Sequence, residues 1–154
     1  MMYAEAVSTL IQEASAAPAL GKSANRFALV ATRNPVYGSD YRVLELLPGE
    51  SLMEGGDVLW SVAAGQPLAD IHAFYREVHA AEFATADWLP LKEAAAALDL
   101  TKQAVNLRLH EGRWPLGHAK ADSVPMQPRP AWFVTRQSVE AVASGAWDTA
   151  EPTL

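Results

Sequence analysis

The sequence predicts an α+β fold in two parts, a small N-terminal α/β unit with a β-hairpin followed by a module of short helices and a second hairpin. Half of the 154 residues are apolar, which is enough for a packed core. Apolar positions at helical spacing alternate with short apolar runs that Gly and Pro bound, a pattern typical of mixed helices and strands. We expect an acidic α+β domain over residues 1–86, a second domain over 87–147 and a flexible tail over 148–154.

The first domain is expected to contain two helices and a β-hairpin. Residues 2–16 carry Ala, Leu and Ile at helical spacing and stop before a proline, so they predict a helix. The apolar runs 26–33 and 41–47 are joined by a link rich in Asn, Pro, Gly and Asp, which favours an antiparallel pair. Residues 58–64 fit either a third strand or a short buried helix. A proline in the first turn favours a second helix over 67–83.

The composition excludes several classes of protein. The chain has no cysteine, which excludes disulfides, thiolate metal sites and cysteine nucleophiles. No apolar run approaches the about 20 residues that span a bilayer. The N-terminus also lacks the basic residues that open a signal peptide. We therefore expect a soluble, cytoplasmic protein that does not bind a membrane.

Charge is distributed unevenly along the chain, whose formal net charge is -6. Residues 1–87 contain five basic and eleven acidic side chains, whereas residues 88–147 contain seven basic and five acidic ones. Phosphate binding depends on Lys and Arg. The second domain is therefore the part of the chain suited to nucleic acid, although its local excess is only two positive charges.

Two short helices joined by a tight turn are expected at the start of the second domain. The first covers residues 91–98 and is interrupted at Asp99. Thr101 can cap the second, over 102–111, because its hydroxyl can accept a hydrogen bond from a free main-chain N–H. Gly112 ends that helix. Two short helices with a turn of three or four residues match the helix-turn-helix pattern.

The second of these helices carries polar side chains beside its apolar stripe. Gln and Asn suit adenine, whereas Lys and Arg suit guanine or phosphate. A helix in the major groove presents its N-terminal residues first, so we expect Lys102, Gln103 and Asn106 to contact bases. The alternative is that this polar face is only solvated. The other candidates for DNA contact on this helix and its cap are Thr101, Arg108 and His110.

A β-hairpin is expected after the second helix. Strands over 117–120 and 131–134 are separated by a loop rich in Pro, and a capped helix over 136–143 follows. A hairpin at this place is a wing, which commonly contacts the DNA backbone or minor groove. Lys120 and Arg129 flank its tip and are candidates for phosphate contact, the alternative being an ordinary surface loop.

These motifs together resemble a known family. The run LPLKEAAAALDLTKQAVNLRLHEGRWP is similar to the helix-turn-helix of the excisionase and MerR-like winged family, chiefly in KEAA, LTKQAV and EGR. The later WFVTRQSVEAV is similar to the strand and helix that close such modules. The resemblance covers about residues 88–144 and implies a winged helix-turn-helix with Lys102, Gln103 and Asn106 on the recognition helix. The turn carries Asp99 where the family usually has glycine.

No pattern in the sequence predicts an enzyme, a cofactor or a metal ion. His72 and His79 lie seven residues apart on a predicted helix, whereas a helical metal pair prefers a spacing of three or four. We expect both to be solvated or interface histidines. A Gly-x-Ser-x-Gly nucleophile elbow is absent, and the glycines of the loop after the hairpin lack the phosphate-cradling pattern.

The predicted function is sequence-specific binding of double-stranded DNA, in a transcriptional regulator that inserts the helix 102–111 into the major groove. One such module contacts one half-site, so we expect a homodimer, with residues 1–86 supporting dimerisation or binding a protein partner. Two alternatives stay open. One is an architectural or accessory DNA protein of the excisionase or DNA-packaging type. The other is a protein-interaction module that keeps the fold without binding DNA.

Overall fold

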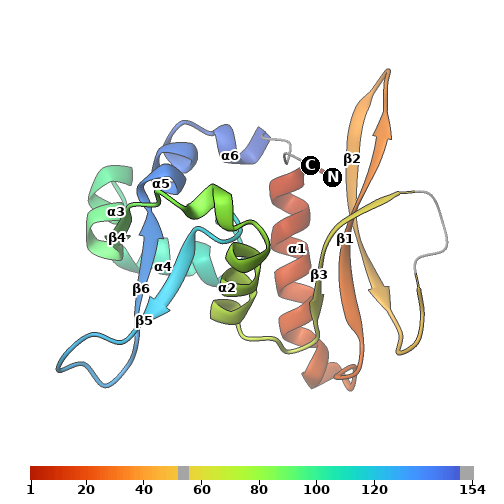
Figure 1. Ribbon diagram of the computed structural model, residues 1–154, viewed down its shortest axis with the longest axis horizontal. Coiled ribbons are helices and arrows are strands. Elements are labelled where there is room, and N and C mark those ends of the chain that lie inside the picture. Colours follow the sequence, from red (N-terminus) through yellow and green to blue (C-terminus); the bar gives the residue numbers. More distant parts are fainter. Residues whose placement is uncertain (52–55, 150–154) are drawn as a thin grey trace. The chain divides into compact units, whose positions relative to one another are not determined.

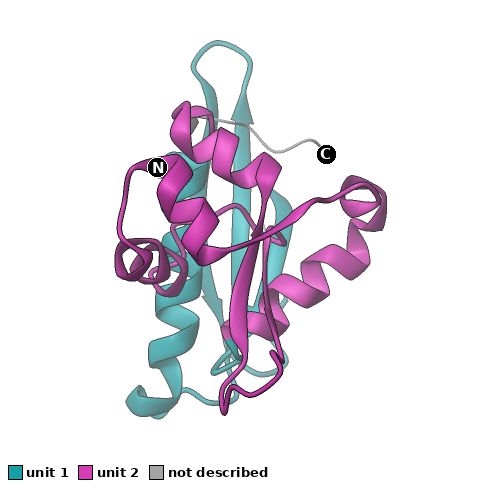
Figure 2. Ribbon diagram, turned by 90° about the vertical axis from the view of Figure 1, so that its left-hand side faces the viewer, with its two compact units in different colours: residues 1–67, 148–154 teal, residues 68–147 magenta. Residues whose placement is uncertain are grey.

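The computed structural model describes residues 1–51 and 56–149, so most of the expected tail over 148–154 lies outside the described residues. The fold is α+β, with helices and two three-stranded antiparallel sheets in this part of the chain. It divides into two compact units (Figure 2): unit 1 is residues 1–67 with 148–154, and unit 2 is residues 68–147. Among the described residues, no helix combines the length and apolar character that crossing a membrane requires.

Unit 1 is a three-stranded sheet with a helix lying along it (Figure 1). The central strand β1 (Arg26–Asn34) pairs antiparallel with β2 (Gly38–Leu46) on one side and with β3 (Asp57–Ala63) on the other. The helix α1 (Tyr3–Ala16) buries an apolar stripe and continues into a short 3₁₀ helix, η1 (Ala17–Leu20). The expected first helix and antiparallel pair are confirmed, and the ambiguous third run is a strand.

The local chemistry of unit 1 explains its hairpin. The Asn34 side chain accepts hydrogen bonds from the main-chain N–H groups of Val36 and Tyr37, at 2.8 and 3.0 Å, which closes the turn between β1 and β2. Residues 27–31 of β1 are all buried, so this strand is covered on both faces. A central strand covered on both faces needs a continuous apolar run rather than an alternating one.

Unit 2 contains the second sheet and the other helices, except that the last helix begins in unit 2 and ends in residues assigned to unit 1. It begins with α2 (Leu68–Val78) and the 3₁₀ helix η2 (Ala80–Phe83). The elements that follow are β4 (Trp88–Pro90), α3 (Leu91–Leu98), α4 (Lys102–His110), β5 (Ala119–Asp122), β6 (Ala131–Thr135), α5 (Arg136–Ala143) and α6 (Ala146–Thr149). The strand order is β4-β6-β5. Two helices and a hairpin thus follow one another in the order expected for a winged helix-turn-helix, whereas the short strand β4 and the helix α6 were not expected.

The pair α3 and α4 is held by caps and by a small-residue contact. Ala94 and Ala95 are buried in the core of unit 2. Asp99 takes the left-handed conformation, with φ of 54°, at the position where a glycine would be usual. The Thr101 hydroxyl accepts a hydrogen bond from the N–H of Ala104 at 3.1 Å, which caps α4 as predicted. The apolar core formed around these helices consists of Leu89, Leu91, Ala94, Ala95, Val105, Leu109, Trp114, Ala119, Val134 and Val139.

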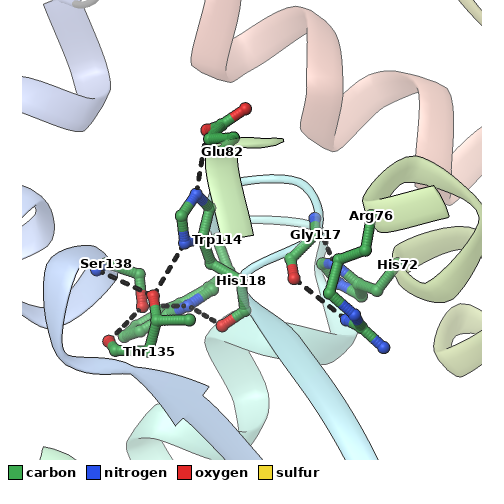
Figure 3. A network of polar contacts seen from close by, with 8 residues as sticks. All are labelled: His72, Arg76, Glu82, Trp114, Gly117, His118, Thr135 and Ser138. Atoms are coloured by element: carbon green, nitrogen blue, oxygen red, sulfur yellow. Dashed lines mark hydrogen bonds and ion pairs between the residues drawn. The ribbon is translucent and has the colours of Figure 1, made fainter. Parts of the chain in front are cut away.

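The helix α2 belongs to unit 2, so the chain divides after residue 67 rather than after residue 86. Hydrogen bonds to the main chain at the start of the hairpin explain the difference (Figure 3). Arg76 donates to the carbonyl oxygens of Gly117 and Ala119, at 2.9 and 2.6 Å. The Gly117 N–H donates to Nδ1 of His72 at 2.9 Å. These bonds join α2 to the segment that leads into β5.

His72 is buried, with 1% of its surface exposed, which corrects the expectation of a solvated or interface histidine. Its Nδ1 accepts a hydrogen bond, so the ring is neutral with the proton on Nε2. Burial lowers the pKa of His72 to about 3, and the nearby positive charge of Arg76 acts in the same direction. The seven-residue spacing of His72 and His79 along the helix carries no information about burial, so the sequence could not predict that His72 is buried.

A second series of hydrogen bonds joins η2 to the sheet and to α5 (Figure 3). The two ring nitrogens of His118 lie 2.7 Å from Thr135 Oγ1 and 3.2 Å from Glu82 Oε1. The Thr135 hydroxyl also accepts the N–H of Ser138 at 3.1 Å and so caps α5. The Trp114 indole N–H donates to the Ser138 hydroxyl at 3.0 Å. Burial lowers the pKa of His118, and its hydrogen bond to Glu82 opposes that shift.

Candidate nucleic-acid interface

A groove of about 900 Å³ lies between α4, the start of α3 and the β5–β6 hairpin of unit 2. The aromatic rings of Trp132 and Phe133 on β6 line part of it. The polar side chains that line it are Lys92, Lys102, Gln103, Asn106, Gln127 and Arg129. Such a set combines hydrogen-bonding amides with positive charge at a concave surface.

The helix α4 presents one face to this groove and the other to the core. Lys102, Gln103 and Asn106 are exposed, and their spacing places them on one side of the helix. Val105 and Leu109 are fully buried on the other side. The N-terminal end of α4, which carries the positive end of the helix dipole, therefore lies beside the groove.

The electrostatic character of the groove follows from its lining. Lys92, Lys102 and Arg129 contribute positive charge. No Asp or Glu is found among the described side chains that line it. Although the whole chain is acidic, with a net charge of -6, this surface is suited to an anion such as a phosphate.

The structure brings four of the sequence-predicted residues together. Lys102, Gln103, Asn106 and Arg129 line the same groove, although Arg129 comes from the loop between the two strands of the hairpin. Thr101 acts as the cap of α4, where its hydroxyl oxygen already accepts a main-chain hydrogen bond. Its role in the described structure is therefore to fix the start of the helix.

Two other predicted residues of α4 lie outside the groove lining. Arg108 is half-buried, and its guanidinium Nε is shielded from solvent. Nδ1 of the exposed His110 lies 2.8 Å from the Asn106 carbonyl oxygen, and its ring packs edge-on against Trp132. His110 lies one turn after Asn106 on the same face of α4, beside the groove-lining Trp132, whereas Arg108 lies on another face of the helix.

Lys120 is also placed apart from the groove. Its Nζ lies 3.1 Å from the Asp122 carboxylate and 4.6 Å from the centre of the Trp88 ring. Arg76 lies over the same ring at 5.2 Å. A cation held by a carboxylate and an aromatic ring is partly neutralised and positioned by the protein itself. Lys120 was expected at the end of a strand over 117–120, next to the tip of the hairpin, whereas β5 runs from Ala119 to Asp122 and so places Lys120 further from the tip.

Sequence reasoning missed two polar residues of the groove. Lys92 stands in the first turn of α3, and Gln127 in the loop of the hairpin. Lys92 offered only its charge, because it stands at the far end of α3 from the turn and its place in the groove is a tertiary feature. Gln127 offered no signal, since its place depends on the path of an irregular loop.

The described residues contain no group of three or more His, Asp or Glu side chains arranged to hold a metal ion. Comparison with protein-family models, with characterised proteins and with solved structures gives no match for this chain. The functional inference therefore depends on the groove itself.

Proposed function

We propose that unit 2 binds double-stranded DNA, with α4 in the major groove, and that the protein acts as a transcriptional regulator. The observation that carries the proposal is the groove, in which three cations and three amide side chains converge beside the start of a helix. Half or more of the hydrogen bonds in protein–DNA complexes go to phosphate and sugar, and the rest read base edges. The groove offers side chains for both kinds of contact, cations for phosphate and amides for base edges.

The residues divide by chemistry between these two tasks. Gln103 and Asn106 carry amides, which can pair with the donor and acceptor edge of adenine in the major groove. Lys102 and Arg129 supply charge for phosphate or for guanine. The resemblance of residues 88–144 to excisionase and MerR-like winged modules supports the same assignment of α4 as the reading helix.

A homodimer is part of the proposal. A single helix-turn-helix contacts one half-site, and two half-sites are needed for useful affinity at physiological salt. Unit 1, the more acidic part, is the candidate for dimerisation because its charge disfavours contact with DNA. Light scattering after size exclusion tests this, and a strict monomer at high concentration would contradict it.

The binding test uses the full chain and a pool of random-sequence duplexes of about 30 base pairs, from which bound sequences are selected. Affinity for a selected duplex is then measured by fluorescence anisotropy at low and at physiological salt. Lys102→Ala should weaken binding to all sequences and reduce the magnitude of the salt slope by about one. Asn106→Ala should relax the base preference at one position of the site.

A matched control is Lys22→Ala, which removes an exposed lysine of unit 1 that pairs with Glu45 at 3.1 Å. We expect it to bind DNA like the parent. Binding that is absent, or that is insensitive to salt and to both groove substitutions, would show that α4 is not a reading helix. That outcome would favour the protein-interaction alternative.

A further inference from the structure

The tip of the β5–β6 hairpin carries an apolar side chain that is fully open to solvent. Met126 has a relative exposure of 103%, the highest of the large apolar residues described. Its φ is 66°, in the left-handed region that favours glycine. A long apolar side chain is thus held out into water at a backbone position that disfavours any side chain.

The turn that presents Met126 is well defined. The Gln127 N–H donates to the Val124 carbonyl oxygen at 3.2 Å, closing a four-residue turn. Pro125 in its second position and a positive φ in its third are the features of a type II turn, whose third position is normally Gly or Asn. Further prolines at 128 and 130 restrict the rest of the loop. The loop therefore holds Met126 at a stiff tip.

This tip adjoins the groove of the proposed function. Val124 and Gln127, which flank the turn, line the groove together with Lys102 and Asn106 of α4. Arg129, two residues further along, adds a positive charge on the same wall. A duplex that placed its major groove on α4 would meet the hairpin loop on the neighbouring part of its surface.

We propose that Met126 inserts as a wedge between two stacked base pairs from the minor groove and kinks the DNA. The inference rests on the proposed function and deepens it, because it makes the protein bend the DNA that it binds. Apolar side chains that enter a base step from the minor groove unstack it and bend the duplex toward the major groove. Methionine suits this place since it is unbranched, flexible and polarisable.

The bending follows from the energetics of base stacking. Burial between bases removes the Met126 side chain from water, which offsets part of the cost of unstacking. Pyrimidine–purine steps unstack most easily, so we expect the wedge to select such a step. Arg129 can hold a phosphate beside the step while the loop prolines keep the tip from folding away.

The experiment uses the full chain and a selected duplex labelled at its two ends with a fluorescence donor and acceptor. Binding of the parent should bring the ends closer and raise energy transfer. Met126→Gly removes the wedge and fits the positive φ of the turn, so it should fold at least as well as the parent and leave the DNA straight. Met126→Leu returns apolar volume to the same position and should restore bending.

A series of the same duplex, with a single-strand nick at each successive step, locates the wedge. A nick at the inserted step removes part of the cost of unstacking, so it should raise the affinity of the parent about tenfold and leave that of Met126→Gly unchanged. Tyr37→Ser is the control, since Tyr37 is an exposed side chain at the tip of the hairpin of unit 1. It should bend DNA like the parent.

The outcomes separate this inference from the proposed function. If the parent binds no duplex in a salt-dependent way, both are overturned. If the parent binds DNA but leaves it straight, or if Met126→Gly bends it as the parent does, the wedge alone is overturned.

Discussion

Substitution of Gly117 by alanine tests how closely α2 and η2 approach the segment that leads into β5. Gly117 has φ of +81°, a left-handed conformation. A Cβ added there would lie 2.5 Å from Cζ of Phe83 and 2.7 Å from Cδ1 of Tyr75. Real Cβ atoms do not approach other atoms so closely, so the two rings or the main chain must move.

The expected loss has two parts. A non-glycine residue in the left-handed conformation costs about 1–2 kcal/mol. Forcing extra volume into a packed site costs about 1–3 kcal/mol more. Gly117→Ala should therefore lower the free energy of unfolding by about 2–5 kcal/mol. The hydrogen bonds of the Gly117 main chain to His72 and Arg76 lie at the same point, so a shift of the chain would also strain them.

Gly145→Ala is the matched control, because Gly145 has φ of +75° and nothing within 4 Å of an added Cβ. It should cost only the conformational part, about 1–2 kcal/mol. Urea unfolding followed by far-ultraviolet circular dichroism measures both variants against the parent. The reasoning is refuted if Gly117→Ala loses no more stability than Gly145→Ala, since the close approach would then carry no cost.

Three further predictions concern the same unit. Because the pKa of His72 is lowered to about 3, only the unfolded state binds its proton below pH 6.5, so stability falls as the pH drops from 6.5 toward 3. His72→Asn should remove about 1.4 kcal/mol per pH unit of that dependence, measured by urea unfolding at several pH values. Arg76→Met leaves two main-chain carbonyls without their donor and should cost about 2–3 kcal/mol in urea unfolding. Thr135→Ala removes a fully buried cap and should lower the melting temperature more than Thr101→Ala, whose loss is about 1 kcal/mol.

Each of these has an outcome that contradicts it. If the parent and His72→Asn lose stability equally as the pH falls, His72 is not the group whose titration causes the loss. For Arg76, the control is Arg136→Met, which breaks an exposed ion pair with Asp87 and should change stability little. Equal effects of the two arginine substitutions would show that the main-chain bonds of Arg76 contribute nothing. If Thr135→Ala and Thr101→Ala lower the melting temperature equally, burial of the cap does not increase its contribution to stability.

Features governed by neighbouring residues were predictable from the sequence. The caps at Thr101 and Thr135 and the left-handed Asp99 depend on atoms within a few residues along the chain. The hairpin of unit 1 depends on turn residues between two apolar runs. The polar face of α4 was also predictable, because burial of Val105 and Leu109 sets which side of the helix is exposed.

Features that depend on distant partners were not predictable. The strand β4 has three residues and contains a proline, and it exists because it pairs with β6, about 45 residues later along the chain. The attachment of α2 to unit 2 depends on side chains that bind main-chain atoms, which leave no pattern in the sequence. For Lys120 the sequence shows only a positive charge, and its contact with the Trp88 ring could not be predicted because the two residues are brought together by the tertiary fold.

The way in which α2 is attached has a consequence for how the protein can change during evolution. Arg76 and His72 bind the carbonyl and N–H groups of residues 117 and 119, not their side chains. Substitutions along β5 and the loop beyond it therefore leave these bonds in place as long as the backbone keeps its path. The exposed positions of the hairpin loop can therefore accumulate substitutions while this support is preserved, whereas Ala119, which is fully buried in the core, cannot.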